Sequence, residues 1–328
     1  MTLLSLFKNT NSNNSHTLIT GDDDFLNDYL ARSYTREKTF AKLDHVTVDC
    51  ESDGLAELIA DLTESSLFSD QKVITVKHPF FLTARVAQKY QQQLAQLERI
   101  LANSDRLEDI IVLVASDEKI DRRKKLTKTV LRQFNVVDTH VKPYEVEKVT
   151  RQLIAAEGYQ LPGPALQLLL ERSDHILDTV LSNLQKLKML AVDGQISVEA
   201  VKRNVDLSMA QNVFAILEAA LKHNYQEAVE RLENQLQEGS NPAQLLAVFE
   251  NQLELILVVK ILQARGRSEG QITKELGVHP YRVKLSLQNG LSVAKLATLL
   301  EQAIKLDFGY KSGQYRDSNF LQLFVLSV

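Results

Sequence analysis

Residues 17–26 read Thr-Leu-Ile-Thr-Gly-Asp-Asp-Asp-Phe-Leu, and this stretch predicts how the first part of the chain folds. The short apolar run at 17–20 is ended by Gly21, a pattern typical of a strand that enters a turn. Apolar side chains then recur at helical spacing over residues 25–30. We therefore predict a strand that passes through a short turn directly into a helix.

Strand-like and helix-like segments continue to alternate from this stretch up to residue 141. The run at 110–114 is continuously apolar, as expected for a strand that is buried on both faces. Further strand-like runs occur at 46–48, 73–76 and 136–141. Such alternation predicts an α/β domain over residues 1–141, with a parallel sheet covered by helices on both faces.

The strand pattern ends at Pro143, and everything that follows has helical periodicity. Residues 142–208 are predicted to form a small helical domain, and residues 209–328 a larger helical bundle. Ser197 is a predicted N-cap of a short helix, and Asn241 followed by Pro242 predicts the start of a long one. The 328 residues include only 12 glycines and six prolines, which favours long regular elements. The predicted fold class is therefore α/β followed by all-α, in three domains.

Composition excludes several classes of function. The formal net charge is −4, which disfavours tight DNA binding by the isolated chain. One cysteine, Cys50, forms neither an internal disulfide nor a multi-cysteine zinc site, and it fits a reducing cytoplasm. The first residues lack the pattern of a signal peptide, and no apolar run reaches the ~18 residues of a membrane span. We expect a cytoplasmic protein without a membrane partner.

A nucleotide site is the first function to test in such a fold, and the sequence argues against it. A phosphate-binding loop needs further glycines and a lysine, whereas the turn at 21–25 carries three aspartates. These carboxylates would repel a triphosphate. Asp117 and Glu118 follow the strand at 110–114 like the acids that hold Mg²⁺ in ATPases, but two residues intervene and no phosphate-binding loop accompanies them, which favours a plain polar loop. No nucleotide or other cofactor is predicted.

No catalytic or metal-binding pattern stands out either. The seven histidines are scattered, and we expect each at the surface or at a helix end. One match to the Gly-x-Ser-x-Gly motif occurs at 266–270, but it lies between two predicted helices rather than after a strand. This match is interpreted as a connector. We therefore predict no catalytic residue and no metal ligand.

Three features leave alternatives open. Leu67 and Phe68 lie in a polar stretch between a helix and a strand, where they either pack inward or serve as exposed anchors for a partner. The basic run 122–125 begins a helix and either is solvated or meets an anionic partner. Residues 272–283 have the pattern of a helix-turn-helix, which a simple corner between two helices also explains.

Five stretches, in this order along the chain, resemble the delta subunit family of the bacterial DNA polymerase III clamp loader. The last of them, Leu-Gly-Val-His-Pro-Tyr-Arg-Val-Lys, is the most specific. The stretches are residues 18–26, 66–76, 121–126, 211–214 and 276–284. The resemblance covers essentially the whole chain, although the first 16 residues depart from the family pattern and residues 309–317 match loosely.

The resemblance implies a degenerate AAA+ architecture with a RecA-like α/β domain, a small helical lid and a helical collar. It implies a subunit that does not hydrolyse ATP, has no catalytic site of its own, and works within the DNA polymerase III holoenzyme. Its partners would be the sliding clamp, the other loader subunits through the collar, and primed DNA within the complex.

The resemblance also implies functional residues. It assigns clamp binding to Leu67 and Phe68, and it suggests a DNA contact through Tyr310 or Tyr315, since a tyrosine ring stacks on a base. It favours a corner between two collar helices at residues 276–284. Two competing hypotheses are an autonomous helix-turn-helix DNA-binding regulator and a functioning ATPase.

Overall fold

The computed structural model describes residues 3–10, 15–63, 71–83, 86–116, 120–315 and 317–328. The chain divides into two compact units. The first unit comprises residues 1–161 and 180–196, and the second comprises residues 162–179 and 197–328.

A six-stranded sheet organises the first unit, with strand order β1-β6-β2-β5-β4-β3. Five strands run parallel: β2 Thr17–Gly21, β3 Asp44–Asp49, β4 Lys72–Lys77, β5 Ile110–Ser116 and β6 Asn135–Asp138. This sheet confirms the predicted α/β fold class. The edge strand β1, Lys8–Thr10, pairs antiparallel with β6. Its three polar residues carry no apolar pattern, and for this reason the sequence predicted no strand there.

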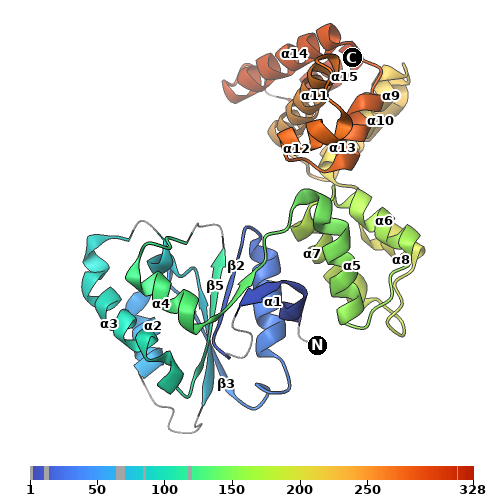
Figure 1. The fold of residues 1–328 in the computed structure, drawn as a ribbon. Coiled ribbons are helices and arrows are strands. Elements are labelled where there is room, and N and C mark those ends of the chain that lie inside the picture. The colour runs from blue at the N-terminus through green and yellow to red at the C-terminus, as the bar shows by residue number, and fades with distance from the viewer. Residues whose placement is uncertain (1–2, 11–14, 64–70, 84–85, 117–119, 316) are drawn as a thin grey trace. The chain divides into compact units, whose positions relative to one another are not determined.

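Helices cover both faces of this sheet (Figure 1). Helix α1, Asp24–Thr35, lies on one face, and the other face carries α2 Gly54–Thr63, α3 Gln91–Ala102 and α4 Lys125–Gln133. Strand β5 is buried on both faces, as its apolar run predicted, because Ile111 and Leu113 pack in the core under α2–α4 while Ile110 and Val112 are buried on the opposite side. Short 3₁₀ turns complete the domain: Leu3–Leu6, Phe80–Leu82, Gln88–Tyr90 and Ser104–Arg106.

Helices replace strands after the sheet, as predicted. The turn Pro143–Glu145 leads into α5, Val146–Ala156, and the next helices are α6 Gly163–Arg172, α7 Leu177–Met189 and α8 Val198–Asn204. Ser197 caps α8 as expected, since its hydroxyl accepts a hydrogen bond of 3.1 Å from the Ala200 amide. The two compact units share residues 142–208 between them. The three-domain division at 141/142 and 208/209 stays a prediction.

The remaining helices build the core of the second unit. They are α9 Met209–Leu221, α10 Tyr225–Gln237, α11 Pro242–Ala264, α12 Glu269–Leu276, α13 Pro280–Gln288, α14 Val293–Lys311 and α15 Asn319–Ser327. The long helix α11 packs against α14 and α9, and its Leu245, Phe249 and Leu253 are fully buried there. Pro242 stands at the first turn of α11 behind the N-cap Asn241, as the sequence predicted.

Candidate functional site

The turn between β2 and α1 is where a phosphate-binding loop would lie, and here it consists of two residues. The carboxylate of Asp23 caps α1 and accepts a hydrogen bond of 2.7 Å from the Leu26 amide. A phosphate bound at a helix N-terminus relies on such amides. Because the chain's own carboxylate caps the Leu26 amide, a phosphate at this turn would meet a negative charge where it needs a donor.

A hydrogen-bond network fills the space beside this turn. The buried Asn27 side chain donates to the Gly21 carbonyl at 3.1 Å and to the Ser116 hydroxyl at 3.0 Å, and its oxygen accepts from the Thr139 hydroxyl. Thr139 also approaches Gly21 so closely that a Cβ there would lie 2.1 Å from its hydroxyl oxygen. Glycine is therefore required at this turn for packing rather than for phosphate binding.

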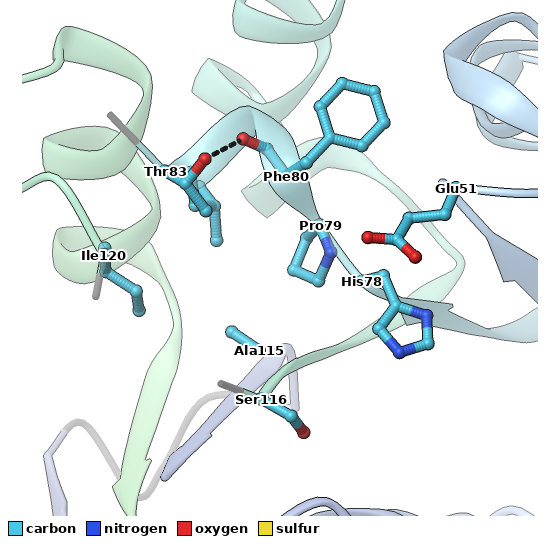
Figure 2. A pocket seen from close by; sticks show the side chains of 9 residues that line it. Glu51, His78, Pro79, Phe80, Thr83, Ala115, Ser116 and Ile120 are labelled. Carbon is cyan, nitrogen blue, oxygen red and sulfur yellow. Dashed lines mark hydrogen bonds between the residues drawn. The ribbon is translucent and has the colours of Figure 1, made fainter. Parts of the chain in front are cut away.

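A pocket lies at the carboxyl ends of β4 and β5, the edge at which open α/β sheets bind ligands. Figure 2 shows Glu51 and His78 on one side of it and Thr83 and Ile120 on the other. Its volume is about 180 Å³, below the ~300–1,000 Å³ of ordinary small-molecule sites. Asp117 and Glu118 lie outside the described residues.

The predicted clamp-binding residues Leu67 and Phe68 also lie outside the described residues. The segment that contains them joins the end of α2 to the start of β4. The described residues on both sides of this segment are fixed by burial or by hydrogen bonds. Leu62 is buried in the last turn of α2. On the other side the Lys72 amide donates to the Asp109 carboxylate at 2.9 Å, and the Gln71 side chain donates to the Glu108 carbonyl.

Tyr310 and Tyr315 lie together in the second unit, at the end of α14 and after it. Both rings pack on Phe320 of α15, each with a centroid distance of 5.3 Å, and the Tyr315 ring is stacked on it. Both side chains are half-buried against the helical core. The structure thus brings the two predicted residues into one aromatic cluster and shows that part of each ring serves the core.

The corner at residues 276–284 is built into the second unit. Gly277 adopts a left-handed conformation at the end of α12, and Val283 of α13 is buried with Ile272 against α11. At the start of α13, the ring of His279 stacks on that of His175 at 3.8 Å. The first turn of α13 is the part a helix-turn-helix uses to contact bases. Its engagement with His175 favours the corner between two collar helices.

One histidine corrects the sequence analysis, which expected every histidine at the surface or at a helix end. His16 is only 4% exposed, and its ring connects the Ser104 carbonyl at 2.8 Å with the Ile111 amide at 3.2 Å. His175 is buried as well, but it lies at a helix end as expected, in the turn after α6, where its amide donates to the Leu170 carbonyl. The error for His16 arises because its ring is held by residues far away in the sequence. Among the described residues, no group of histidine, cysteine and carboxylate side chains is placed to hold a metal ion.

The Gly-x-Ser-x-Gly match is a connector, as interpreted. Ser268 caps α12, and Gln271 completes a capping box with it. The serine therefore serves the helix start and does not stand on a nucleophile elbow.

The sequence analysis did not predict that apolar side chains of α14 are exposed. Ile304 is 53% exposed and Phe308 is 73% exposed, one helical turn apart. The helical periodicity of the segment predicted a helix with apolar side chains. Only the packing of α14 shows which of these side chains remain exposed to solvent. Ile304 and Phe308 form a small exposed apolar area on α14. Among the helices of the described residues, none combines the length and apolar character needed to cross a lipid bilayer.

These observations define a class. The chain has a RecA-like, mostly parallel α/β domain followed by helical segments, and Asp23, Asn27 and Thr139 fill the turn where a nucleotide-binding domain of this kind carries its phosphate-binding loop.

Comparisons with known proteins agree with this class and specify the family. A family model for the DNA polymerase III delta subunit matches residues 18–140, and a model for the C-terminal domain of that subunit matches residues 210–328. DNA polymerase III subunit delta of Bacillus subtilis (strain 168) is 28% identical over 285 residues, covering 85% of this chain and 82% of that protein. The solved structure of the Bacillus subtilis DNA clamp loader delta protein matches with a TM-score of 0.64 and 26% identity, over 95% of this chain and 94% of that one. The chain belongs to the DNA polymerase III delta subunit family.

Proposed function

We propose that this delta subunit binds the ring-shaped sliding clamp and holds one of its interfaces open, so that the clamp is loaded on primed DNA during replication. The subunit has no catalytic site of its own in this proposal and serves the DNA polymerase holoenzyme in the cytoplasm. Membership of the delta subunit family is the observation that supports it most strongly. The closed nucleotide position agrees with a subunit that relies on partners for ATP-driven steps.

The proposed clamp contact is the pair Leu67 and Phe68. Burying both side chains in an apolar pocket of the clamp would release ~3–5 kcal/mol, which anchors the contact and leaves it reversible. Because α2 and β4 hold both ends of the segment, a force transmitted through it acts on the α/β domain as a whole. The subunit would favour the open clamp by binding it more tightly than the closed one.

A pull-down of the sliding clamp with the wild-type chain and the Leu67→Ala/Phe68→Ala variant tests this contact. We expect clamp recovery to fall at least tenfold for the variant. The Leu190→Ala/Val192→Ala variant is the matched control, since it truncates two exposed apolar side chains of the first unit. Undiminished clamp binding by a correctly folded Leu67→Ala/Phe68→Ala variant would refute the assignment.

The proposed contact with the other loader subunits lies in the helical collar at residues 209–328. The exposed pair Ile304 and Phe308 supports it, because apolar side chains left outside a packed bundle are available to a neighbouring collar. Gel filtration of the reconstituted loader tests it. The Ile304→Ser/Phe308→Ser variant should fail to co-elute with the other subunits while its own helical content is unchanged.

A DNA contact through Tyr310 and Tyr315 stays a proposal. The packing of both rings on Phe320 leaves part of each ring for a base. Replacement of each tyrosine by leucine keeps an apolar side chain in the core and removes the stacking face. A loader assembled with that variant should bind primed DNA several-fold more weakly, and equal binding would refute the contact.

The ATPase alternative predicts nucleotide binding by the isolated chain. We expect calorimetric titration with ATP and Mg²⁺ to give no saturable heat, because the Asp23 carboxylate caps the Leu26 amide and would repel a phosphate there. Saturable binding would favour the ATPase alternative over the proposed role.

A further inference from the structure

A concentrated positive charge marks the beginning of α4. Six cations occur between residues 122 and 132, and no carboxylate occurs from 122 to 137, in a chain whose formal net charge is −4. We name this feature the α4 basic surface. It consists of Arg122, Arg123, Lys124, Lys125, Lys128 and Arg132.

Packing of α4 directs these charges outward. Its opposite face buries Leu126 and Val130 against the sheet. Lys125, Lys128 and Arg132 are exposed and follow helical spacing, so they form a stripe ~10 Å long at 1.5 Å per residue. Arg122 and Arg123 extend the stripe into the preceding turn and are exposed as well.

The charges are unfavourable for the helix that carries them. Cations at a helix N-terminus oppose the macrodipole at a cost of ~0.3–1 kcal/mol each. The first turn of α4 has no acidic residue, and no side chain among the described residues caps it. Helix stability therefore does not explain this cluster.

Carboxylates compensate only part of the charge. Among the described residues, Asp121 pairs with Arg123 at 2.9 Å and Glu98 pairs with Lys125 at 2.6 Å. The hydrogen bonds from Arg123 lower the pKa of Asp121 to about 2, so this carboxylate is already fully ionised at neutral pH. Within the part of the chain that the structure describes, Arg122, Lys124 and Lys128 form no ion pair with a carboxylate, so this surface keeps a positive charge.

We propose that the α4 basic surface binds the sugar-phosphate backbone of a nucleic acid. A row of exposed lysine and arginine side chains matches a row of phosphates, and the uncapped amides of the first turn add donors for one of them. Contacts of this kind position a nucleic acid without selecting its sequence. The residues of this surface differ from Leu67, Phe68 and the two tyrosines named above, so the proposal extends the proposed function on which it rests.

The test is a fluorescence-anisotropy titration of the full chain with a labelled DNA duplex and with the same strand alone, at several salt concentrations. The Arg122→Gln/Lys125→Gln/Lys128→Gln variant should bind at least tenfold more weakly at low salt. Its slope of log affinity against log salt should be shallower by about 3 with duplex, or about 2 with the single strand. The two probes distinguish duplex from single-stranded backbone.

The Lys186→Gln/Lys202→Gln/Arg203→Gln variant is the matched control, since it removes three exposed cations elsewhere. It should bind like the wild type. The proposal fails if the wild type binds neither probe at low salt, or if both triple variants lose affinity equally. It also fails if polyglutamate displaces the labelled DNA from the wild-type chain as effectively as unlabelled DNA of equal charge does. An acidic protein face would then be the partner. If the α4 variant still recovers the clamp in a pull-down, its loss of DNA binding is independent of the proposed clamp binding.

Discussion

The Nζ atom of Lys188 lies 2.8 Å from the hydroxyl oxygen of Tyr29, and both groups also contact the carboxylate of Glu157. The three residues come from α7, from α1, and from the residue that ends α5. Only 11% of the Lys188 side chain and 22% of the Glu157 side chain are exposed. The cluster therefore connects α1 to the end of α5 and to α7, within the first unit.

Loss of the Lys188 ammonium should destabilise the first unit markedly. Lys188→Met leaves the Glu157 carboxylate poorly solvated without its partner, and we expect a loss of ~3 kcal/mol in the free energy of unfolding. Tyr29→Phe removes one hydrogen bond and should cost ~1 kcal/mol. Urea unfolding measures both. Lys186→Met, on the exposed face of the same helix, is the control, and an equal loss for the two lysine variants would contradict the prediction.

Stability should fall in mildly acidic solution because of His16. Burial lowers the pKa of His16, although its hydrogen bond to the Ser104 carbonyl opposes this shift. Below the ordinary value of ~6.5 the unfolded chain therefore binds a proton that the folded chain resists, so this contribution is complete above ~6.5 and is lost as the pH falls. His16→Gln, which keeps one donor and one acceptor, should flatten the pH dependence of urea unfolding in that window. An unchanged profile would show that another group is responsible.

Substitution of Gly21 should strain the turn between β2 and α1. A Cβ at this position would lie 2.1 Å from the Thr139 hydroxyl oxygen and 2.9 Å from its carbonyl carbon. Gly21→Ala is expected to cost ~1–3 kcal/mol, as overpacking does elsewhere. Gly290→Ala has open space around its Cβ and should change thermal stability little. Similar melting temperatures for the two variants would be inconsistent with the close approach.

The tyrosines at the end of α14 should contribute to the collar's stability through their rings. Tyr315→Ala removes the ring stacked on Phe320 and is expected to cost ~2 kcal/mol, less than for a fully buried aromatic residue. Tyr315→Phe keeps the ring and should cost little. Thermal unfolding followed by circular dichroism separates the two, and a Tyr315→Phe variant as unstable as Tyr315→Ala would assign the effect to the hydroxyl instead.

Local patterns in the sequence determined most of the fold class. The apolar run at 110–114 predicted a strand buried on both faces, and Ser197 and Asn241-Pro242 marked helix starts that the structure confirms. The sequence also shows that the turn at 21–25 lacks the residues of a phosphate-binding loop, because such a loop depends on a few neighbouring residues. Periodicity and caps are local physical signals, so one sequence suffices to predict them.

Contacts between distant residues were decided only by the tertiary structure. The burial of His16 depends on Ser104 and Ile111, and the pairing of β1 depends on β6, whose partners lie more than a hundred residues away. No local pattern predicts these contacts. The periodicity of a helix or strand shows which face of the element is apolar, but it does not show which other element packs against that face. The ion cluster of Lys188, the closed turn beside Thr139 and the exposed Ile304 and Phe308 all arise in this way. The sequence by itself determined the order and type of the elements, whereas packing between elements decided which side chains are buried, paired or left for a partner.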